Sequence, residues 1–340
     1  MGEIKGLRPI SEQVVVVTGA SSGIGRETAI RFGQRGASVV LAARNEPALQ
    51  EVAREVERLG SNALVVVTDV AEWEQMDRLA QEAVARFGRI DTWVNVAAIA
   101  GYGTVEQTPI EEIERQIQVI LMSQIYGVKA ALPYMKRERR GTIVNVGSVL
   151  GVRSVPLQAA YCAAKSGIKA FTDSLRLELK QEKAGIDVTL ILPSSINTPL
   201  FSHARSRLGV KPKPIPPVYE PRVVAEAILF AAEHPRREIV VGGGGKMLTV
   251  MERLSPSLLD RLMLARDQSF RQQMTDRPDD GEDNFFGSMD GSGSVTGEFG
   301  SRSRSTSPYT RHLEQYPNRK RLVLSATTLI AAALVRRVGR

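Results

Sequence analysis

The sequence predicts an α/β protein built on a doubly wound, mostly parallel, seven-stranded sheet. From Gln13 to about Val241, short β-branched runs alternate with longer amphipathic stretches, which is the sequence form of a parallel sheet with helices on both faces. The 340 residues are 43% hydrophobic and 24% charged, so the chain can bury a full core. These two observations together predict one large α/β domain over residues 8–245.

Each element of this domain can be placed by its pattern. The strands are expected at Val14 to Thr18, Ser38 to Ala42, Ala63 to Thr68, Thr92 to Val96, Thr142 to Val146, Val188 to Leu192 and Glu238 to Val241. Periodic helices are expected between them, among others at 46–59, 74–87 and 161–180, with Gly60, Gly88 and Gly185 as C-caps. Right-handed crossovers then give a Rossmann-like sheet with ligands beyond the carboxyl ends of the strands.

Three further segments follow the sheet. Residues 246–274 predict a helical extension, and residues 275–320, rich in Gly, Ser, Asp and Arg, are interpreted as a flexible linker. Residues 321–340 contain the apolar run Leu322 to Val335 between basic residues. A helix over this run would span roughly 21 Å, short of a bilayer core of about 30 Å. The run is therefore either a C-terminal membrane contact or a helix docked on the protein or on a neighbouring subunit.

Composition excludes several classes of protein. Cys162 is the single cysteine and there are three histidines, so neither an intrachain disulfide nor a Cys/His zinc cluster is expected. Met1 to Gln13 lacks the apolar region of a secretory signal, which predicts a cytoplasmic protein. The net charge of +8 and pI of about 9.7 come without a base-reading motif, so nucleic acid is not an expected partner.

The strand-to-helix connection Thr18 to Gly25 reads Thr-Gly-Ala-Ser-Ser-Gly-Ile-Gly. Gly19 permits a tight turn, Gly23 lets the backbone approach a pyrophosphate, and Gly25 lets the helix pack closely on the strand. The N-terminus of the following helix offers N–H groups and a positive dipole to phosphates. Alone, this pattern is also compatible with an ordinary strand-to-helix turn.

Two residues at the ends of the second and third strands bear on the identity of a dinucleotide. A free ribose 2′-hydroxyl is usually held by a carboxylate after the second strand, whereas a 2′-phosphate prefers an arginine. Arg44 stands at that place. It predicts NADP(H), with NAD(H) as the less favoured cofactor, unless Arg44 is a solvated surface residue. Asp69 is placed to accept from an adenine amino group or to cap the following helix.

Ser148 follows the fifth predicted strand, and Tyr161 and Lys165 stand four residues apart on the next predicted helix. Positions four apart share one helix face, so both side chains project toward the strand end that carries Ser148. A tyrosine, with an ordinary pKa of about 10, needs a nearby cation to act as an acid or base near neutrality, and Lys165 is such a cation. The three residues predict proton transfer, although an isolated Tyr–Lys pair is also compatible with a plain helix surface.

Five motifs, in their order and spacing, resemble the classical short-chain dehydrogenase/reductase family over roughly residues 10 to 245. They are Thr18 to Gly25, Asn95 to Ala98, Ser148, Tyr161 with Lys165, and Pro193 to Thr198. The resemblance implies hydride transfer between a nicotinamide cofactor and a small-molecule carbonyl or alcohol, with no metal. It also implies a homo-oligomer, because members of the family commonly form dimers or tetramers.

The roles of individual residues are implied by the same resemblance. Tyr161 would donate or accept the proton, Lys165 would bind the nicotinamide ribose and lower the tyrosine pKa, and Ser148 would polarise the carbonyl. Asn95 would support the central sheet, and Pro193 to Thr198 would contact the nicotinamide. The expected cofactor-binding residues are Gly19, Ser21, Ser22, Gly23, Ile24, Gly25, Arg44, Asp69, Val70, Asn95, Ala97, Tyr161, Lys165, Pro193, Ile196 and Thr198.

The sequence departs from the family pattern at two positions. Ala98 stands where the family usually has glycine. Ile120 stands where the helix expected from Glu111 to Lys136 normally carries an asparagine that helps to hold a proton-relay water. Either Ser123 or a backbone carbonyl holds that water instead, or turnover is slow.

The substrate site is expected between Ala100 to Thr108, Val149 to Leu157 and Leu200 to Tyr219. The large residues of these segments are Tyr102, Val149, Leu150, Val152, Val155, Leu157, Leu200, Phe201, Leu208 and Val218. Such a lining predicts a lipophilic substrate, unless these residues pack the lid. Arg153, Arg205 and Arg207 are interpreted as solvated residues rather than partners of an acidic substrate group.

Two other functions stay open. One is a catalytically weak nucleotide-binding or scaffold protein of the same fold, which Ile120 permits and the intact Ser148, Tyr161 and Lys165 oppose. The other is a peripheral membrane protein in which the enzyme fold is incidental. Deletion of Leu322 to Arg340 would distinguish that function, because only fractionation would change.

Overall fold

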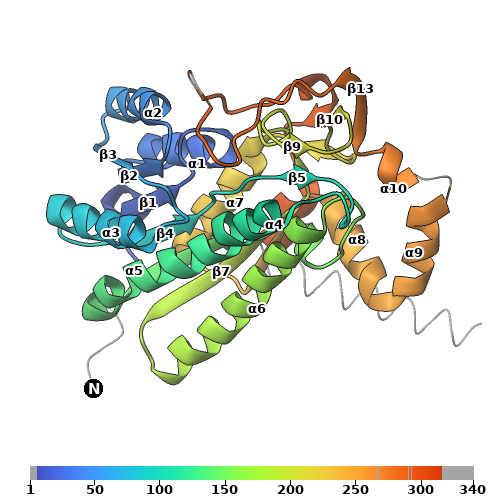
Figure 1. Ribbon diagram of the computed structural model, residues 1–340. Coiled ribbons are helices and arrows are strands. Elements are labelled where there is room, and N and C mark those ends of the chain that lie inside the picture. Colours follow the sequence, from blue (N-terminus) through green and yellow to red (C-terminus); the bar gives the residue numbers. More distant parts are fainter. Residues whose placement is uncertain (1–5, 266–267, 290, 292, 316–340) are drawn as a thin grey trace, which may run out of the picture.

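The computed structural model describes residues 6–265, 268–289, 291 and 293–315. Its central sheet has seven parallel strands in the order β12-β7-β6-β4-β1-β2-β3 (Figure 1). The strands are β1 (Val14–Thr18), β2 (Ser38–Ala43), β3 (Ala63–Val67), β4 (Thr92–Asn95), β6 (Gly141–Val146), β7 (Ile186–Pro193) and β12 (Glu238–Val241). The predicted doubly wound fold class is confirmed, and each strand lies within two residues of its expected bounds.

Helices cover both faces of this sheet. One face carries α1 (Gly23–Gln34), α2 (Glu46–Arg58) and α7 (Pro221–Glu233), and the other carries α3 (Trp73–Phe87), α5 (Ser123–Glu138) and α6 (Ala159–Gln181). The helix expected from Glu111 to Lys136 is divided by a π-helical turn, Gln118–Met122, into α4 (Ile110–Ile117) and α5. Alternate side chains of each strand point to opposite faces of the sheet and pack in the two apolar layers.

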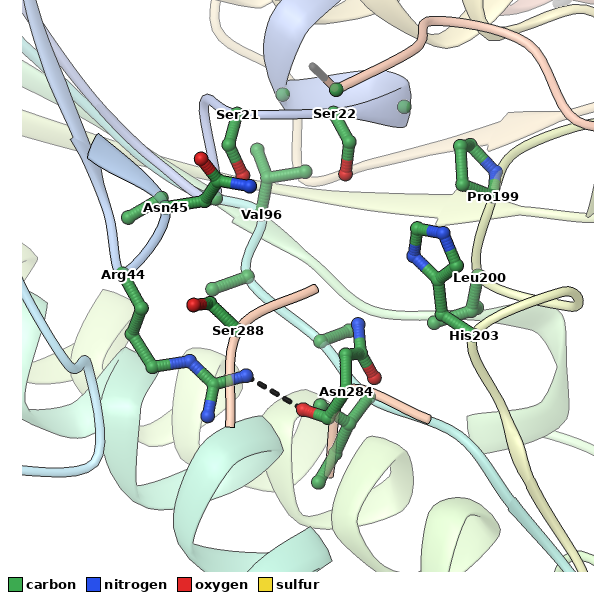
Figure 2. A pocket seen from close by; sticks show the side chains of 18 of the residues that line it. Ser21, Ser22, Arg44, Asn45, Val96, Pro199, Leu200, His203, Asn284 and Ser288 are labelled. Atoms are coloured by element: carbon green, nitrogen blue, oxygen red, sulfur yellow. Dashed lines mark hydrogen bonds between the residues drawn. The ribbon is translucent and has the colours of Figure 1, made fainter. Parts of the chain in front are cut away.

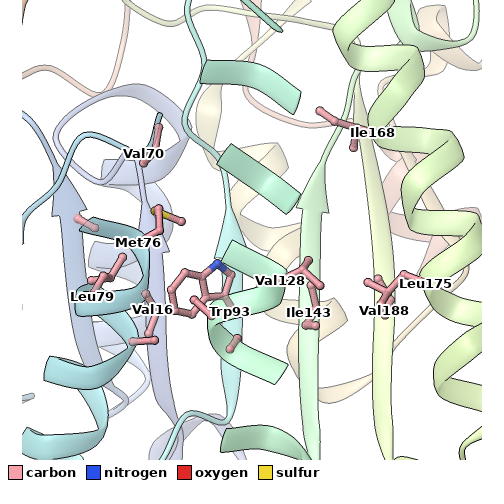
Figure 3. Close-up of a cluster of buried hydrophobic side chains, with 14 of the residues drawn as sticks. Val16, Val70, Met76, Leu79, Trp93, Val128, Ile143, Ile168, Leu175 and Val188 are labelled. Carbon is pink, nitrogen blue, oxygen red and sulfur yellow. The ribbon is translucent and has the colours of Figure 1, made fainter. Parts of the chain in front are cut away.

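The core layer under α3, α5 and α6 is centred on Trp93. Its side chain is fully buried between the sheet and the helices, among Val16, Met76 and Val128 (Figure 3). Each such large apolar side chain contributes about 1.5–3 kcal/mol when fully buried. This packing holds the strand ends that carry the site in fixed positions.

After β12 the chain folds back on the domain, and the described part of the predicted linker 275–320 is not free. Helices α8 (Gly243–Leu254), α9 (Pro256–Leu264) and α10 (Gln268–Arg271) come first. Strand β13 (Met274–Pro278) then pairs with β10 (Val210–Pro212), and β14 (Ser303–Arg304) pairs with β11 (Val218–Tyr219), which also pairs with β8 (Ser195–Ile196). Backbone hydrogen bonds therefore join the described part of 275–315 to the domain without a second core.

A short parallel pair, β5 (Gly101–Tyr102) and β9 (Arg205–Ser206), brings the segment after β4 next to the segment after β7. No helix among the described residues is long and apolar enough to cross a membrane. The apolar run Leu322 to Val335 lies outside the described residues.

Candidate active site

The loop between β1 and α1 makes two close approaches that require glycine. Gly19 has a φ of +70°, and a Cβ there would lie 2.9 Å from the Cα of Ala97. A Cβ on Gly25 would lie 2.1 Å from the carbonyl oxygen of Gly19. A side chain at either position would force the loop to shift. The loop therefore holds the N-terminus of α1 beside the ends of β1 and β4.

A cavity of about 240 Å³ lies against this loop. Figure 2 shows Ser21 and Ser22 on one side of the cavity and Arg44 reaching toward its middle from the end of β2. The expected cofactor-binding residues that line it are Gly19, Ser21, Ser22, Gly23, Ile24, Gly25, Arg44, Asp69, Val70, Ala97 and Thr198. Residues from four strand ends thus meet at one cavity, as the topology of a parallel sheet requires.

Arg44 and Asp69 bring opposite charges to this cavity. Burial lowers the pKa of the Arg44 guanidinium, which remains cationic at neutral pH. Burial raises the pKa of Asp69, but hydrogen bonds from the Ala71 N–H and from Arg115 outweigh this and hold the pKa below its usual value. The carboxylate accepts from the Ala71 N–H at 3.0 Å and from Arg115 Nη2 at 2.9 Å. Asp69 is therefore already engaged by the turn that precedes α3.

The walls of this cavity fit a nicotinamide dinucleotide. The glycine loop keeps Cβ atoms away from the place of a pyrophosphate, and the N-terminus of α1 favours negative charge there. Arg44 supplies the cation that a 2′-phosphate prefers. The donor set is thus suited to phosphate groups.

Ser148, Tyr161 and Lys165 line a second, larger cavity of about 470 Å³. Ser148 follows β6, and its Oγ accepts from the Leu150 N–H at 3.0 Å. Lys165 lies one turn after Tyr161 on α6, and its Nζ is 5.7 Å from the centre of the tyrosine ring. The structure therefore brings together the three residues that the sequence predicted to act together.

Burial shifts the pKa values of two of these groups toward their uncharged forms. It raises the pKa of Tyr161 far above its ordinary value, and a hydrogen bond with Ser148 offsets only part of this rise. It lowers the pKa of Lys165 to about 7. Tyr161 is therefore a neutral phenol at physiological pH, and a neutral phenol can donate a proton.

The two cavities adjoin. Ile24 and Thr198 line both of them, and the expected cofactor-binding residues Pro193 and Ile196 line the larger one. A dinucleotide that lay in the smaller cavity could therefore extend past Thr198 toward Tyr161. This continuity is what direct hydride transfer beside a proton donor requires.

Asn95 lines neither cavity. Its Nδ2 donates to Asn145 Oδ1 at 2.9 Å, and its Oδ1 accepts from the Trp93 indole N–H at 2.8 Å. A Cβ on Gly127 would lie 2.3 Å from Asn95 Oδ1, so α5 approaches this group at a glycine. Asn95 thus occupies a buried position between β4, β6 and α5.

Ile120 lies fully buried in the π-helical turn between α4 and α5. The hydroxyl of Ser123 donates to the Val119 carbonyl at 2.6 Å and so satisfies the helix one turn back. The single hydroxyl hydrogen of Ser123 is therefore already used in a hydrogen bond one helical turn back.

Gln124, unlike Ser123, shares a hydrogen-bond acceptor with the predicted catalytic residue Lys165. Its Nε2 donates to the Val146 carbonyl at 3.0 Å, and the same oxygen accepts from Lys165 Nζ at 2.9 Å. The amide oxygen of Gln124 is buried and has no hydrogen-bond partner among the described residues. The sequence alone does not single out Gln124, because its partner Val146 lies 22 residues later, on β6.

The larger cavity has mostly apolar walls. Of the large residues expected there, Tyr102, Val149, Leu150, Val155, Leu200 and Phe201 line it, whereas Val152, Leu157, Leu208 and Val218 do not. Helices α8 and α9 add Met247, Leu248, Met251, Leu259, Leu262 and Met263. The amphipathic pattern predicted a helical extension here but did not indicate which face would border a cavity.

The prediction that Arg153 is a solvated residue is wrong. Its side chain is 14% exposed, donates to Glu252 Oε2 at 2.9 Å and also pairs with Asp260. These ion pairs tie the turn after β6 to α8 and α9. Arg153 therefore helps to close the larger cavity on the side of the C-terminal helices.

Arg205 and Arg207 also have protein partners. Both form ion pairs with the buried carboxylate of Glu112, at 3.0 Å from the Nε of Arg205. The pairs join the segment after β7 to α4. The smaller cavity is also lined by residues that no predicted cofactor motif contains, among them Val119, Pro199, His203, Asn284, Ser288, Met289 and Gly293.

Comparison with known proteins agrees with this fold. A family model described as short chain dehydrogenase matches residues 13–209. The uncharacterized oxidoreductase YxnA of Bacillus subtilis is 42% identical over 259 residues, which cover 76% of this chain and 73% of that protein. Dehydrogenase/reductase SDR family member 7B of Xenopus laevis is 35% identical over 264 residues, which cover 74% of this chain and 81% of that protein.

Among solved structures, an alcohol dehydrogenase from the archaeon Thermococcus sibiricus, complexed with 5-hydroxy-NADP, matches with a TM-score of 0.59. It is 23% identical and covers 67% of this chain and 95% of its own. This likeness concerns the fold. The family model and the curated relatives together define an α/β oxidoreductase of the nicotinamide-dependent class.

Within that class, the chain belongs to the short-chain dehydrogenase/reductase family. It is an oxidoreductase of CH–OH and C=O groups that works with a nicotinamide cofactor.

Proposed function

We propose that the protein is an NADP(H)-dependent oxidoreductase that interconverts the carbonyl and alcohol forms of a lipophilic small molecule. The observation that carries this proposal is the meeting of Ser148, Tyr161 and Lys165 on the wall of one apolar cavity that adjoins the cofactor cavity. The preference for NADP(H) rests on the cation of Arg44. The lipophilic substrate rests on the apolar walls.

When bound, the nicotinamide supplies or accepts the hydride. In the reductive direction, Ser148 donates a hydrogen bond to the substrate carbonyl oxygen and orients it. Tyr161 then gives its proton to that oxygen as the carbonyl carbon gains the hydride. Lys165 in its protonated form stabilises the phenolate that is left. The apolar walls exclude water from this exchange.

The phenolate must recover a proton, and we propose that Gln124 positions the water that returns it through Lys165. The Gln124 amide nitrogen and Lys165 Nζ share the Val146 carbonyl as acceptor, and the unpaired amide oxygen offers an acceptor for a buried water. We expect Gln124→Met to lower kcat about tenfold and to change its pH profile. Unchanged kcat and pH profile would remove Gln124 from the proton path.

The test of the proposed function is NADPH oxidation by a panel of ketones and aldehydes of increasing apolar size. We expect turnover that favours NADPH over NADH and rises with apolar size. In Tyr161→Phe, which still binds NADPH, we expect turnover to fall about 1,000-fold. NADPH binding without turnover across the panel would support the scaffold alternative. If neither nucleotide binds, the proposed function is wrong.

Two expectations concern parts of the protein outside the site. A homo-oligomer stays a prediction from the family, and light scattering coupled to size-exclusion chromatography would test it. A membrane contact through Leu322 to Val335 stays a prediction from the sequence. Deletion of Leu322 to Arg340 would test it, because loss of the segment would move the protein from the membrane fraction while turnover stayed unchanged.

A further inference from the structure

A segment far along the chain crosses the cofactor cavity. We call residues 284–289 and 293–299 the strap. In Figure 1 the chain runs from β13 back across the strand ends toward α1 and α2. Asn284, Ser288, Met289 and Gly293 of the strap line the cavity, opposite the glycine-rich loop. The strap bridges the cavity without filling it, because about 240 Å³ remains between the two walls.

The strap is held by donors of the cofactor wall. Arg44 donates from Nη2 to the Asn284 carbonyl at 2.6 Å and from Nη1 to the Phe286 carbonyl at 3.1 Å. Asn45, which also caps α2, donates from Nδ2 to the Met289 carbonyl at 2.7 Å. These carbonyl acceptors fix the Arg44 guanidinium beside the cavity while leaving its charge unneutralised.

The two ends of the strap are anchored to the catalytic domain. Phe285 is fully buried, and its carbonyl accepts from Arg115 Nε at 3.1 Å. At the other end, the buried side chain of Asn197 accepts from the Phe299 N–H at 3.0 Å, and the Asn197 carbonyl accepts from the Gly297 N–H at 3.2 Å. Between these anchors, the Gly23 N–H donates to the Ser294 carbonyl at 2.8 Å.

The strap also presents polar atoms to the cavity. Figure 2 shows the side chains of Asn284 and Ser288 on the side opposite Ser21 and Ser22. The Oδ1 atom of Asn284 is buried and has no hydrogen-bond partner in the described part of the chain. A buried unpaired amide oxygen is costly, and a ribose hydroxyl is a donor that would satisfy it.

We propose that the strap is a clasp that closes over the bound dinucleotide, with Asn284 and Ser288 as additional cofactor-binding residues. The proposal rests on the proposed function only in needing a dinucleotide in the cavity. Two properties follow. The dinucleotide reaches the cavity only when the strap opens, and it leaves slowly because the strap must open again.

Hydrogen exchange of the full-length wild-type protein tests the direction of this coupling. We expect NADPH to slow amide exchange in residues 284–289 and 293–299 together with the glycine-rich loop. Faster exchange in the strap would mean that the strap competes with NADPH, and protection of the loop alone would mean that the strap is a bystander. Either result overturns the clasp. If NADPH protects neither region, the proposed function itself fails.

Two glycines of the same segment provide a matched pair of variants. A Cβ on Gly293 would lie 1.8 Å from the Ser21 carbonyl oxygen, whereas a Cβ on Gly287 meets nothing within 4 Å. Gly293→Ala therefore pushes the strap off the loop and Gly287→Ala does not. We expect NADPH to leave Gly293→Ala about tenfold faster in stopped-flow fluorescence, as the loss of one hydrogen bond would give, and to leave Gly287→Ala at the wild-type rate.

Thermal melting without cofactor is the control for folding, and we expect the two variants to have similar melting temperatures. Equal NADPH dissociation rates in Gly293→Ala and Gly287→Ala would contradict the clasp, and so would tighter binding by Gly293→Ala. As a second variant that leaves the backbone in place, Asn284→Ala should also weaken NADPH binding. An unchanged Kd in Asn284→Ala would remove Asn284 from the binding site.

Discussion

The two cavities that adjoin at Ile24 and Thr198 are built from different parts of the chain. The smaller one is lined by the glycine-rich loop, the strand ends and the strap, and the larger one mostly by apolar side chains, several of them from α8 and α9. A loop in which a Cβ at Gly19 or Gly25 would clash tolerates few side chains, whereas a wall of apolar side chains changes size with each substitution. We therefore expect cofactor affinity and substrate affinity to respond to different substitutions.

The largest effect is expected at the proton donor on the wall of the larger cavity. Tyr161→Phe removes the proton donor and should lower kcat about 1,000-fold, while the Kd of NADPH stays close to wild type. The matched control is Tyr102→Phe, because Tyr102 is also buried and lines the same cavity. Steady-state kinetics and nucleotide titration would check this. Comparable losses in both variants would show that Tyr161 has no special chemical role.

A smaller effect is expected for the charge in the cofactor cavity. Arg44→Leu should raise the Kd of NADPH about 10- to 100-fold, the value of one or two charged hydrogen bonds, and change the Kd of NADH little. Arg58→Leu, at an exposed position on α2, is the control. Fluorescence titration with both nucleotides measures the ratio. Equal losses for NADPH and NADH would mean that Arg44 does not recognise the 2′-phosphate.

The substrate cavity should respond independently of the cofactor. Leu259 is 5% exposed and lines the larger cavity, whereas its neighbour Leu258 is 51% exposed and does not. Leu259→Ala should raise the KM of the best apolar substrate about tenfold and leave the Kd of NADPH unchanged. Leu258→Ala should change neither constant. An unchanged KM in Leu259→Ala would place the substrate away from α9.

The smallest expected effect concerns stability. Burial lowers the pKa of Lys165 from 10.5 to about 7, so between these values the unfolded chain holds a proton that the folded chain lacks. The cost of burying Lys165 is therefore complete below about pH 7 and disappears as the pH rises toward about 10.5. The Val146 carbonyl keeps its bond from Gln124 when Lys165 is removed.

We therefore expect Lys165→Met to increase the free energy of unfolding, on the order of 1 kcal/mol at about pH 6, and by less at about pH 9. Urea unfolding at both values would check this, with the exposed Lys180→Met as control. A gain that grew with pH would contradict the buried, shifted lysine. The same variant should lose turnover, so stability and activity change in opposite directions.

The contrast between the cavities also explains what the sequence could predict. Strands such as Val14 to Thr18 and the loop glycines are indicated by local signals, namely β-branched runs and the spacing of glycines between a strand and a helix. The pairing of Tyr161 with Lys165 follows from helical spacing alone. The cofactor and catalytic residues could therefore be proposed from neighbouring residues.

The missed features depend on contacts between distant segments. The strap has the composition of a linker, yet it is held through its own carbonyl groups by Arg44 and Asn45, which composition does not reveal. Aromatic residues within this polar segment, such as the fully buried Phe285, are the one local signal of an anchor. The role of Arg153 likewise depends on Glu252, 99 residues later in the chain. Local sequence patterns predict single helices and strands, whereas the walls of the two cavities depend on how distant segments pack together.

The central claim is that Tyr161 and an NADPH-derived hydride act together on a lipophilic carbonyl. The most direct measurement is the transfer of deuterium from NADPH labelled at the nicotinamide C4 to a bulky ketone, followed by mass spectrometry of the alcohol. We predict one deuterium on the carbinol carbon for each NADPH consumed by the wild type, and labelled alcohol formed about 1,000-fold more slowly by Tyr161→Phe. NADPH binding without labelled product from any ketone or aldehyde of the panel would contradict the claim.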